Sequence, residues 1–275
     1  MQKSEPLPVY DSARRGSAPL EELRELFRYR NLVSQMVRRD IVTRYKRSVL
    51  GVAWTMLNPL GTTLVLTIVF SQVFSVEQSY AGYVLSGLMP WTFFAQTTNA
   101  AMVSLVWGGG LLKRIYLPRT IFAISGVGTG LVNLLLSLVP LVLILVLTGV
   151  PITTAAIFLP IPILFLTMFS LGVGLLISTV AIYFADVAEM YQVILTAWMY
   201  LSPVIYTTDM LPPQYAWVVK LNPMYYIIQL FRAPIYEGRV PDLQEFLLTG
   251  AISLVTLILG WLFFSIKADE FAYRI

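Results

Sequence analysis

The sequence contains no cysteine and no histidine, and only 12% of its 275 residues are charged. The first two absences exclude disulfides, thiol chemistry, histidine acid–base catalysis and the usual zinc sites. The scarcity of charge separates the chain from soluble domains, in which about 25% of residues are charged. Because 57% of the residues are hydrophobic, the composition indicates an integral membrane protein.

The sequence also lacks recognisable catalytic machinery. No G-x-x-x-x-G-K-[ST] motif occurs, so we expect the chain not to bind ATP through a P-loop. Its apolar segments hold no cluster of titratable side chains of the kind that an enzyme or a proton-coupled transporter needs. Asp186 and Glu189 lie near a helix end, where solvated or helix-N-terminal carboxylates are common. We therefore expect a non-catalytic chain without its own metal or cofactor, which moves its substrate downhill or with a partner's energy.

Positive charge is concentrated just before the first long apolar run. The stretch RRDIVTRYKRSVLGVAWTMLNPL (38–60) carries five Lys or Arg residues, and no charged residue follows Arg47 until Glu77. A basic segment in this position lies on the cytoplasmic side of a membrane, where anionic lipids attract it. The same placement makes anionic lipid a better partner than nucleic acid.

The residues before the first span divide into two segments. Residues 1–18 show no hydrophobic periodicity and are predicted to be a flexible cytosolic tail. A helix start is indicated at Pro19, and residues 19–49 are predicted to form an amphipathic interfacial helix. Arg30 and Arg44 fall among its apolar positions, so either the helix breaks near Asn31 or these arginines meet lipid phosphates. Residues 50–275 are predicted to form the transmembrane domain.

The remaining chain can be divided by the rule that a spanning helix needs about 20 apolar residues. This predicts an all-α membrane protein with six crossings, near Gly51–Phe74, Gly82–Gly109, Ile121–Thr148, Ala155–Tyr183, Glu189–Tyr206 and Phe246–Ile266. With this arrangement, sixteen of the nineteen Lys and Arg residues lie on one side and three on the other. The positive-inside rule then places both termini in the cytoplasm.

The segment Thr207–Glu245 differs from an ordinary loop. Its apolar pieces, Tyr215–Leu221 and Met224–Phe231, are too short to span a membrane and are bounded by prolines. Short apolar pieces of this kind are typical of re-entrant or interfacial helices. We therefore predict short re-entrant outer helices between the fifth and sixth spans.

Aromatic side chains are frequent in the predicted spans. Rings near the span ends fit the aromatic belts of a membrane interface, which is the commoner role of Trp and Tyr. Aromatic faces combined with a few hydroxyls also suit a path for sugar rings. The candidates for such a path are Trp54, Trp91, Phe94, Trp198, Tyr200 and Tyr206.

Several blocks of the sequence resemble a known family. RYKRSVLGVAWTMLNPL, WTFFAQ, LLKRIYLPRTIFAIS, YFADVAEMYQVILTAWMYLSPVIYT and LNPMYYIIQLFRAPIYEG are similar, in this order, to blocks of ABC-2 type permeases that export polysaccharides. The resemblance covers about Arg38 to Ile266 and is strongest to the membrane subunits of O-antigen, capsule and teichoic acid exporters. It implies a homodimer in the bacterial inner membrane, joined to two copies of an ATPase subunit that binds ATP and Mg²⁺. The implied substrate is a polysaccharide linked to undecaprenyl diphosphate.

The resemblance also suggests roles for particular residues. A lipid-diphosphate entrance would comprise Arg44, Arg47, Arg39 and Lys46, since guanidinium groups bind such oxygens bidentately; the alternative is that these residues only set topology. A helix within Leu111–Thr120 that couples to the ATPase would comprise Leu112, Lys113, Arg114, Ile115, Tyr116, Pro118 and Arg119. An outer gate would comprise Asn222, Pro223, Tyr225, Tyr226 and Arg232. Alternative functions are a permease for a drug or lipid and, more remotely, a membrane transferase or a passive channel.

Overall fold

The computed structural model describes residues 28–73, 79–107, 120–184 and 186–271. Within these ranges the chain is entirely helical, apart from turns, and contains no β-strand. The α-helices are α2 (Arg30–Tyr45), α3 (Trp54–Phe70), α4 (Tyr80–Trp107), α6 (Thr120–Leu147), α7 (Pro160–Tyr183), α8 (Val187–Leu201), α9 (Ala216–Lys220), α10 (Pro223–Ile235) and α11 (Leu243–Lys267). Five short 3₁₀ turns, η1 to η5, connect or extend these helices.

Four helical segments in the described part of the chain are long and apolar enough to cross a membrane. They are Gly51–Phe70, Thr120–Leu147, Thr154–Tyr183 and Leu243–Lys267. They coincide with the first, third, fourth and sixth predicted crossings. The other two predicted crossings correspond to α4, which contains several polar residues, and to α8, which has only 15 residues.

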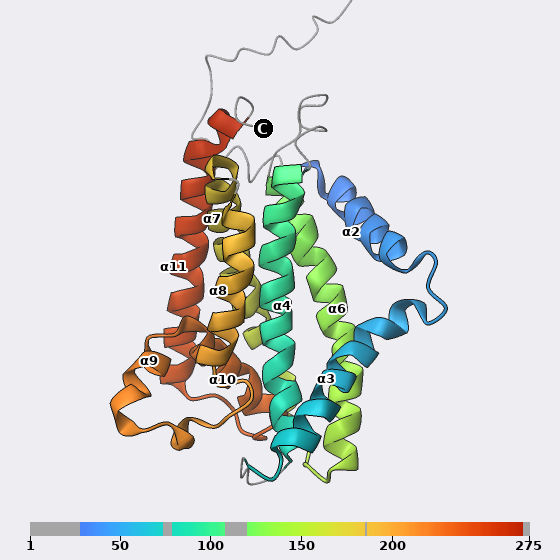
Figure 1. Ribbon diagram of the computed structural model, residues 1–275, viewed down its shortest axis with the longest axis vertical. Coiled ribbons are helices and arrows are strands. Elements are labelled where there is room, and N and C mark those ends of the chain that lie inside the picture. Colours follow the sequence, from blue (N-terminus) through green and yellow to red (C-terminus); the bar gives the residue numbers. More distant parts are fainter. Residues whose placement is uncertain (1–27, 74–78, 108–119, 185, 272–275) are drawn as a thin grey trace, which may run out of the picture.

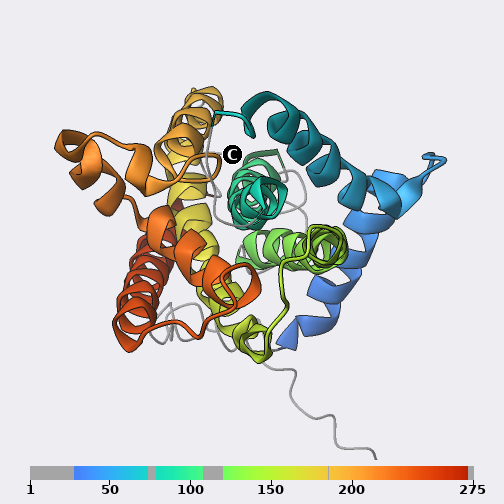
Figure 2. The same cartoon turned by 90° about the horizontal axis from the view of Figure 1, so that it is seen from below.

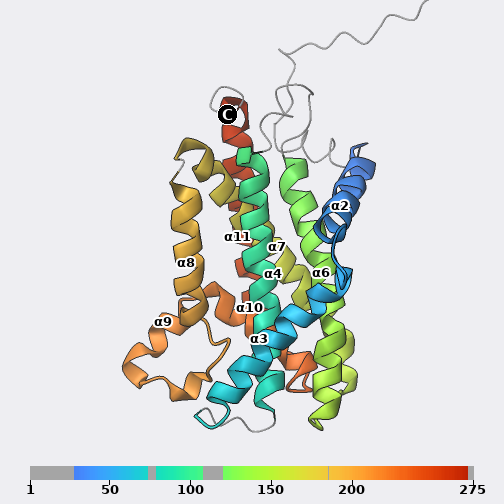
Figure 3. The same ribbon diagram turned by 45° about the vertical axis from the view of Figure 1, so that its right-hand side comes forward.

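The long helices form a bundle in which neighbours along the chain run in opposite directions (Figures 1 and 3). Helix α4 lies at the centre, with α3, α6, α7 and α8 around it, as the view along the bundle shows (Figure 2). Helices α9 and α10 lie at one end, which we call the α10 end (Figure 1). The end of α7, the start of α8 and the C-terminal end of α11 lie together at the opposite end (Figure 1).

Glycine allows the closest helix contact in the bundle, that of α7 with α11. A Cβ atom added at Gly172 would lie 2.5 Å from the backbone oxygen of Thr256. A Cβ at Gly260 would collide with the backbone oxygen of Gly172. Small residues at such crossings let two backbones pack directly, which is how many membrane helices associate. Gly172 therefore serves close helix packing, with α11 as the partner.

Helix α2 lies against α6 rather than far from the bundle (Figure 3). It contacts the bundle core through Met36, its only buried residue, and through the partly buried Leu32 and Val33. The helix begins at Arg30, with Tyr29 as its N-cap residue in a turn. Of the two alternatives for the basic residues in the apolar stripe, a helix break near Asn31 is thus present, at Tyr29.

Helices α4 and α6 are longer than a membrane requires. Each has 28 residues, which corresponds to about 42 Å at 1.5 Å per residue, whereas the hydrocarbon core is about 30 Å thick. Their ends therefore extend beyond the apolar layer. The charged turn after α2 flanks the bundle part-way along its length (Figure 1).

Candidate functional site

The basic turn between α2 and α3 is exposed. Arg44, Lys46 and Arg47 are all accessible, and their side chains form no hydrogen bond or ion pair within the described ranges. Arg39, one helical turn earlier, instead donates to the Asp40 carboxylate at 2.8 Å. Three of the four cations predicted to form the entrance are therefore available to a ligand, and the fourth is already paired with an acid.

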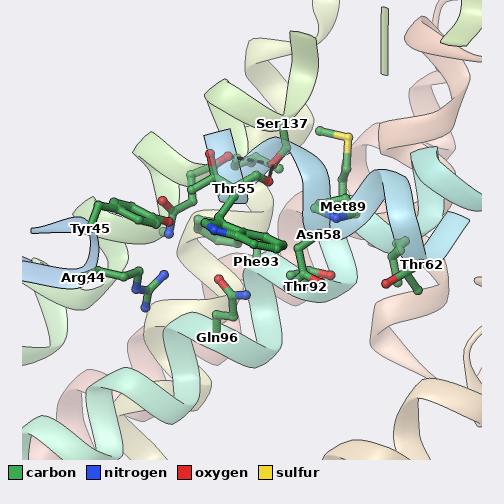
Figure 4. A pocket seen from close by; sticks show the side chains of 16 residues that line it. Arg44, Tyr45, Thr55, Asn58, Thr62, Met89, Thr92, Phe93, Gln96 and Ser137 are labelled. Atoms are coloured by element: carbon green, nitrogen blue, oxygen red, sulfur yellow. Dashed lines mark hydrogen bonds between the residues drawn. The ribbon is translucent and has the colours of Figure 1, made fainter. Parts of the chain in front are cut away.

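Arg44 also lines a cavity that lies between α3, α4 and α6. The cavity has a volume of about 290 Å³. Figure 4 shows Arg44 and Tyr45 at one side of it and Asn58 and Phe93 nearer its middle. Its polar lining residues are Arg44, Tyr45, Thr55, Asn58, Thr62, Thr92, Gln96, Asn133 and Ser137, and its aromatic ones are Trp54 and Phe93. The cavity therefore joins one cation to several amides and hydroxyls.

A second group of polar residues connects α4 to α8. The Tyr191 hydroxyl donates to the Thr98 hydroxyl at 2.7 Å in a buried position. Nearby, the Gln192 amide donates to the Asn99 amide oxygen at 2.6 Å, and this pair is exposed. Together with the exposed Gln96, these amides make α4 polar on the side between α3 and α8.

These amides are not among the site residues predicted from the sequence. The signal was present, because uncharged amides inside apolar segments are costly to expose to lipid and usually mark a functional or water-filled region. A search restricted to charged and aromatic residues passes over them.

Some of the predicted path aromatics lie in the core of the subunit. Trp91 and Phe94 are 4% and 0% exposed, and they pack with Phe169 and Trp198 at ring-centroid distances of 5.0–6.5 Å. The surface of this chain therefore does not include Trp91 or Phe94, which differs from the expectation for a lining residue. Trp54 and Tyr200 are exposed, by 51% and 63%, and remain candidates.

The residues of the predicted outer gate form the start and the body of α10. Asn222 is the N-cap: its side-chain oxygen accepts from the Met224 backbone N–H at 3.0 Å, and Pro223 occupies the first helical turn. The same amide oxygen accepts from the Trp198 indole at 2.8 Å. The Asn222 side chain thus links the end of α8 to the beginning of α10 by hydrogen bonds.

The two tyrosines of the predicted gate are partly exposed. Tyr225 and Tyr226 lie with their rings 5.0 Å apart, and the Tyr226 hydroxyl donates to the Lys220 carbonyl at 2.8 Å. Helix α10 itself is mostly buried, against α4, α7 and α11. This segment is accordingly a packed part of the bundle and not a plain external loop.

Arg232 of α10 is completely buried, at 0% exposure. Its guanidinium donates to the backbone carbonyls of Pro203 at 2.7 Å, Val204 at 3.0 Å and Tyr83 at 3.2 Å. It also lies 3.7 Å from the centre of the Tyr83 ring. Because the chain leaves helical geometry after α8, the Pro203 and Val204 carbonyls lack the usual helical donors, and Arg232 supplies them. The Tyr83 carbonyl belongs to α4 and also accepts from the Ser86 hydroxyl.

The other arginine of this segment has a different environment. Arg239 is partly exposed and is paired with Glu237 and Glu245, at 2.7 Å in each case. Hydrogen bonds to Glu245 raise the pKa of the Arg239 guanidinium above its ordinary value. Exposed pairs of this kind contribute little to stability, so Arg239 offers a matched comparison for the buried arginine.

The predicted ATPase-coupling residues, from Leu112 to Arg119, lie outside the described residues. Their role remains a prediction. In the part of the chain that the structure does describe, no group of three or more acidic residues could hold a metal ion.

Comparison with known proteins identifies relatives of the chain. Residues 31–236 match the family described as ABC-2 type transporter. An O-antigen export system permease protein, RfbA of Myxococcus xanthus, is 30% identical over 92% of this chain and 98% of its own length. The capsule polysaccharide export inner-membrane protein CtrC of Neisseria meningitidis serogroup A is 25% identical over 86% and 91%. The polysialic acid transport protein KpsM of Escherichia coli is 22% identical over 83% and 90%.

Proposed function

Since this chain belongs to the ABC-2 type transporter family, we propose that it is the membrane subunit of an ATP-driven polysaccharide exporter. The substrate is an undecaprenyl-diphosphate-linked glycan of the O-antigen kind, and it moves from the cytoplasmic to the outer side of the inner membrane. The observation that carries this proposal is the near full-length similarity to a permease named for O-antigen export. Relatives named for capsule and polysialic acid transport support the same substrate class.

A separate ATPase supplies the energy in this proposal. The sequence has no P-loop, so ATP and Mg²⁺ bind to the partner and this chain is not itself an enzyme. The segment 111–119 receives the motion of the partner. Ile115 and Tyr116 are its anchors, because buried aliphatic and aromatic residues usually contribute most to interface affinity.

The chain crosses the membrane six times, through α3, α4, α6, α7, α8 and α11, with both termini in the cytoplasm. The alternating helix directions (Figures 1 and 3) and the distribution of Lys and Arg support this arrangement. Helix α8 is short for a crossing, but the chain continues beyond it into η3, α9 and α10. These elements cover the remaining depth at the α10 end.

Two copies of the chain form the transport path. Only Thr63 of α3 and only Tyr191 and Leu195 of α8 are buried within the described part of this chain, so both helices have faces that a second copy can cover. Between them lie the exposed amides of α4 and α8. Such amides are unfavourable against lipid but suit a hydrated path for hydroxyl-rich sugars, which favours a glycan over an apolar drug.

The diphosphate of the substrate enters at Arg44 and Arg47. Both side chains are exposed and without acidic partners in the described ranges, and each planar guanidinium can bind two phosphate oxygens. If the two residues serve only as topology signals, lysine replaces them without loss. We expect Arg44→Lys with Arg47→Lys to reduce export strongly, whereas Arg38→Lys, the same change at an exposed α2 arginine outside the predicted entrance, does not.

Cells that lack this chain test the proposal itself. They should accumulate lipid-linked glycan that is inaccessible to a lectin added outside the inner membrane, and the native gene should restore access. The substitutions at Arg44 and Arg47 are then compared with Arg38→Lys at equal protein level and equal ATPase binding. Normal glycan export in cells without the chain would refute the proposed function, whereas native export by the paired lysine variant would refute only the entrance.

A further inference from the structure

The cavity beside Arg44 contains three amide side chains that the protein itself does not use. Asn58 comes from α3, Gln96 from α4 and Asn133 from α6. Asn58 and Gln96 are exposed and Asn133 is half-buried, and none of their side-chain amides has a hydrogen-bond partner within the described ranges. Unpaired amides in such apolar helices need water or a ligand.

The hydroxyls around the amides are partly occupied. The Ser137 hydroxyl donates to the Asn133 carbonyl at 2.9 Å, and the Thr55 hydroxyl donates to the Val52 carbonyl at 2.7 Å. Hydroxyls that bond to their own helix contribute little further specificity. The hydroxyls of Tyr45, Thr62 and Thr92 have no hydrogen-bond partner within the described ranges, so they and the three amides are the free donors and acceptors of the cavity. The amides converge on it from three helices.

The remaining wall is mainly apolar, includes aromatic residues and carries a single charge. Trp54 and Phe93 supply aromatic rings to the lining, and Arg44 is the only charged residue that lines the cavity in the described part of the chain. Amides with aromatic faces suit a saccharide ring, which has hydroxyls at its edge and C–H groups on its faces. A cation beside such a place suits a phosphate attached to that ring.

The size and composition of the cavity argue against a polymer, an acyl chain and a divalent cation as its ligand. The volume of about 290 Å³ lies at the lower limit of ligand pockets, roughly 300–1,000 Å³, so the cavity can hold one ring but not a polymer. An acyl chain would leave the amides unpaired, and a divalent cation would need carboxylates, which are absent from the described lining. The chemistry therefore corresponds to a sugar next to a phosphate.

We propose that this cavity binds the first sugar of the lipid-linked glycan, the one joined to the diphosphate, while Arg44 binds a phosphate oxygen. The inference rests on the proposed function and extends it, because it assigns recognition of the substrate's lipid-proximal end to this chain. A subunit that holds the first sugar selects the lipid-linked glycan over the sugar-free carrier lipid. The carrier is thus kept from competing for export.

Lipid binding by the full chain in nanodiscs tests this inference. The two probes are undecaprenyl diphosphate and the same lipid carrying one N-acetylglucosamine. We expect the native chain to bind the sugar-bearing lipid about tenfold more tightly, a difference that about two net hydrogen bonds can supply. The double variant Asn58→Leu with Asn133→Leu should lose this preference and keep its affinity for the sugar-free lipid.

Control variants separate the sugar from the phosphate. Arg44→Lys should weaken binding of both lipids by the same factor and leave the preference intact. Gln244→Leu removes an exposed amide of α11 that lies outside the cavity, and it should bind both lipids like the native chain. If the double variant misfolds, Gln96→Leu serves in its place, because this exposed side chain can change without repacking the core.

The outcomes distinguish the two levels of the proposal. Loss of the preference in the amide variants, with the sugar-free lipid still bound, supports the inference. Equal affinity of the native chain for the two lipids, or an undiminished preference in the amide variants, overturns it and leaves the proposed function in place. Failure of the native chain to bind either lipid overturns the proposed lipid-diphosphate substrate itself.

Discussion

Replacing Arg232 by methionine should destabilise the α10 end of the bundle. The Tyr83 carbonyl would keep the Ser86 hydroxyl at 2.9 Å, and the Pro203 carbonyl would keep only a long contact of 3.5 Å with the Tyr83 hydroxyl. The Val204 carbonyl has no second donor among the described residues. Each buried carbonyl left unpaired costs about 1–3 kcal/mol.

The lost contact with the Tyr83 ring adds to this cost. The loss is partly offset because methionine avoids the free-energy cost of burying a charged guanidinium. We therefore expect a net loss of about 2–4 kcal/mol, which corresponds to a fall in melting temperature of at least about 4 °C for a chain of this size.

Thermal unfolding of the purified, detergent-solubilised chain measures this effect. Arg239→Met is the matched control, since Arg239 lies in the same segment but makes only exposed ion pairs, each worth about 0.2–1 kcal/mol. The account requires Arg232→Met to melt well below Arg239→Met. If the two variants melt at the same temperature, the buried arginine does not hold the end of α8 and α10 together, and the reasoning from its three carbonyl partners is refuted.

Three further predictions follow from individual contacts. Gly87→Ala should lower the melting temperature, because the added Cβ would collide with the Arg232 guanidinium. Gly61→Ala should not lower it, because no atom lies within 4 Å of the added Cβ, and equal melting temperatures of the two variants would contradict the packing described. Gly260→Ala should destabilise the chain by about 1–3 kcal/mol through overpacking against α7, and an unchanged melting temperature would show that the two helices can separate at little cost. The double variant Ile115→Asp with Tyr116→Asp should reach the membrane but fail to co-purify with the ATPase, and normal co-purification would disprove the assigned anchors.

The sequence predicted the helices well because hydrophobic length determines them. The third crossing was expected at Ile121–Thr148 and is observed at Thr120–Leu147. The short apolar piece Met224–Phe231 corresponds to the core of α10 at Pro223–Ile235. Proline and asparagine mark its start in the sequence, and they form its N-cap in the structure.

The sites were harder to predict because they depend on which helix faces meet. Trp91 and Phe94 looked like lining residues, yet the same aromatic character serves the core, and composition does not distinguish the two. Arg232 was expected at a gate, but no sequence pattern shows that its partners would be backbone carbonyls at the end of α8. The cavity amides Asn58 and Asn133 are far apart in the chain, and only the packing of α3 against α6 brings them together.

ATP-driven movement of the glycan in a purified system tests the central claim most directly. Proteoliposomes contain the chain and its ATPase with the nucleotide site outward, and a labelled undecaprenyl-diphosphate-linked glycan is added to the outer leaflet. The account predicts that ATP moves the glycan into the lumen, where added glycosidase cannot reach it. Vesicles that contain either protein alone should not move the glycan, and vesicles that contain only this chain should not hydrolyse ATP. Saturable ATP hydrolysis by this chain alone, or glycan protection that does not require ATP, would contradict it.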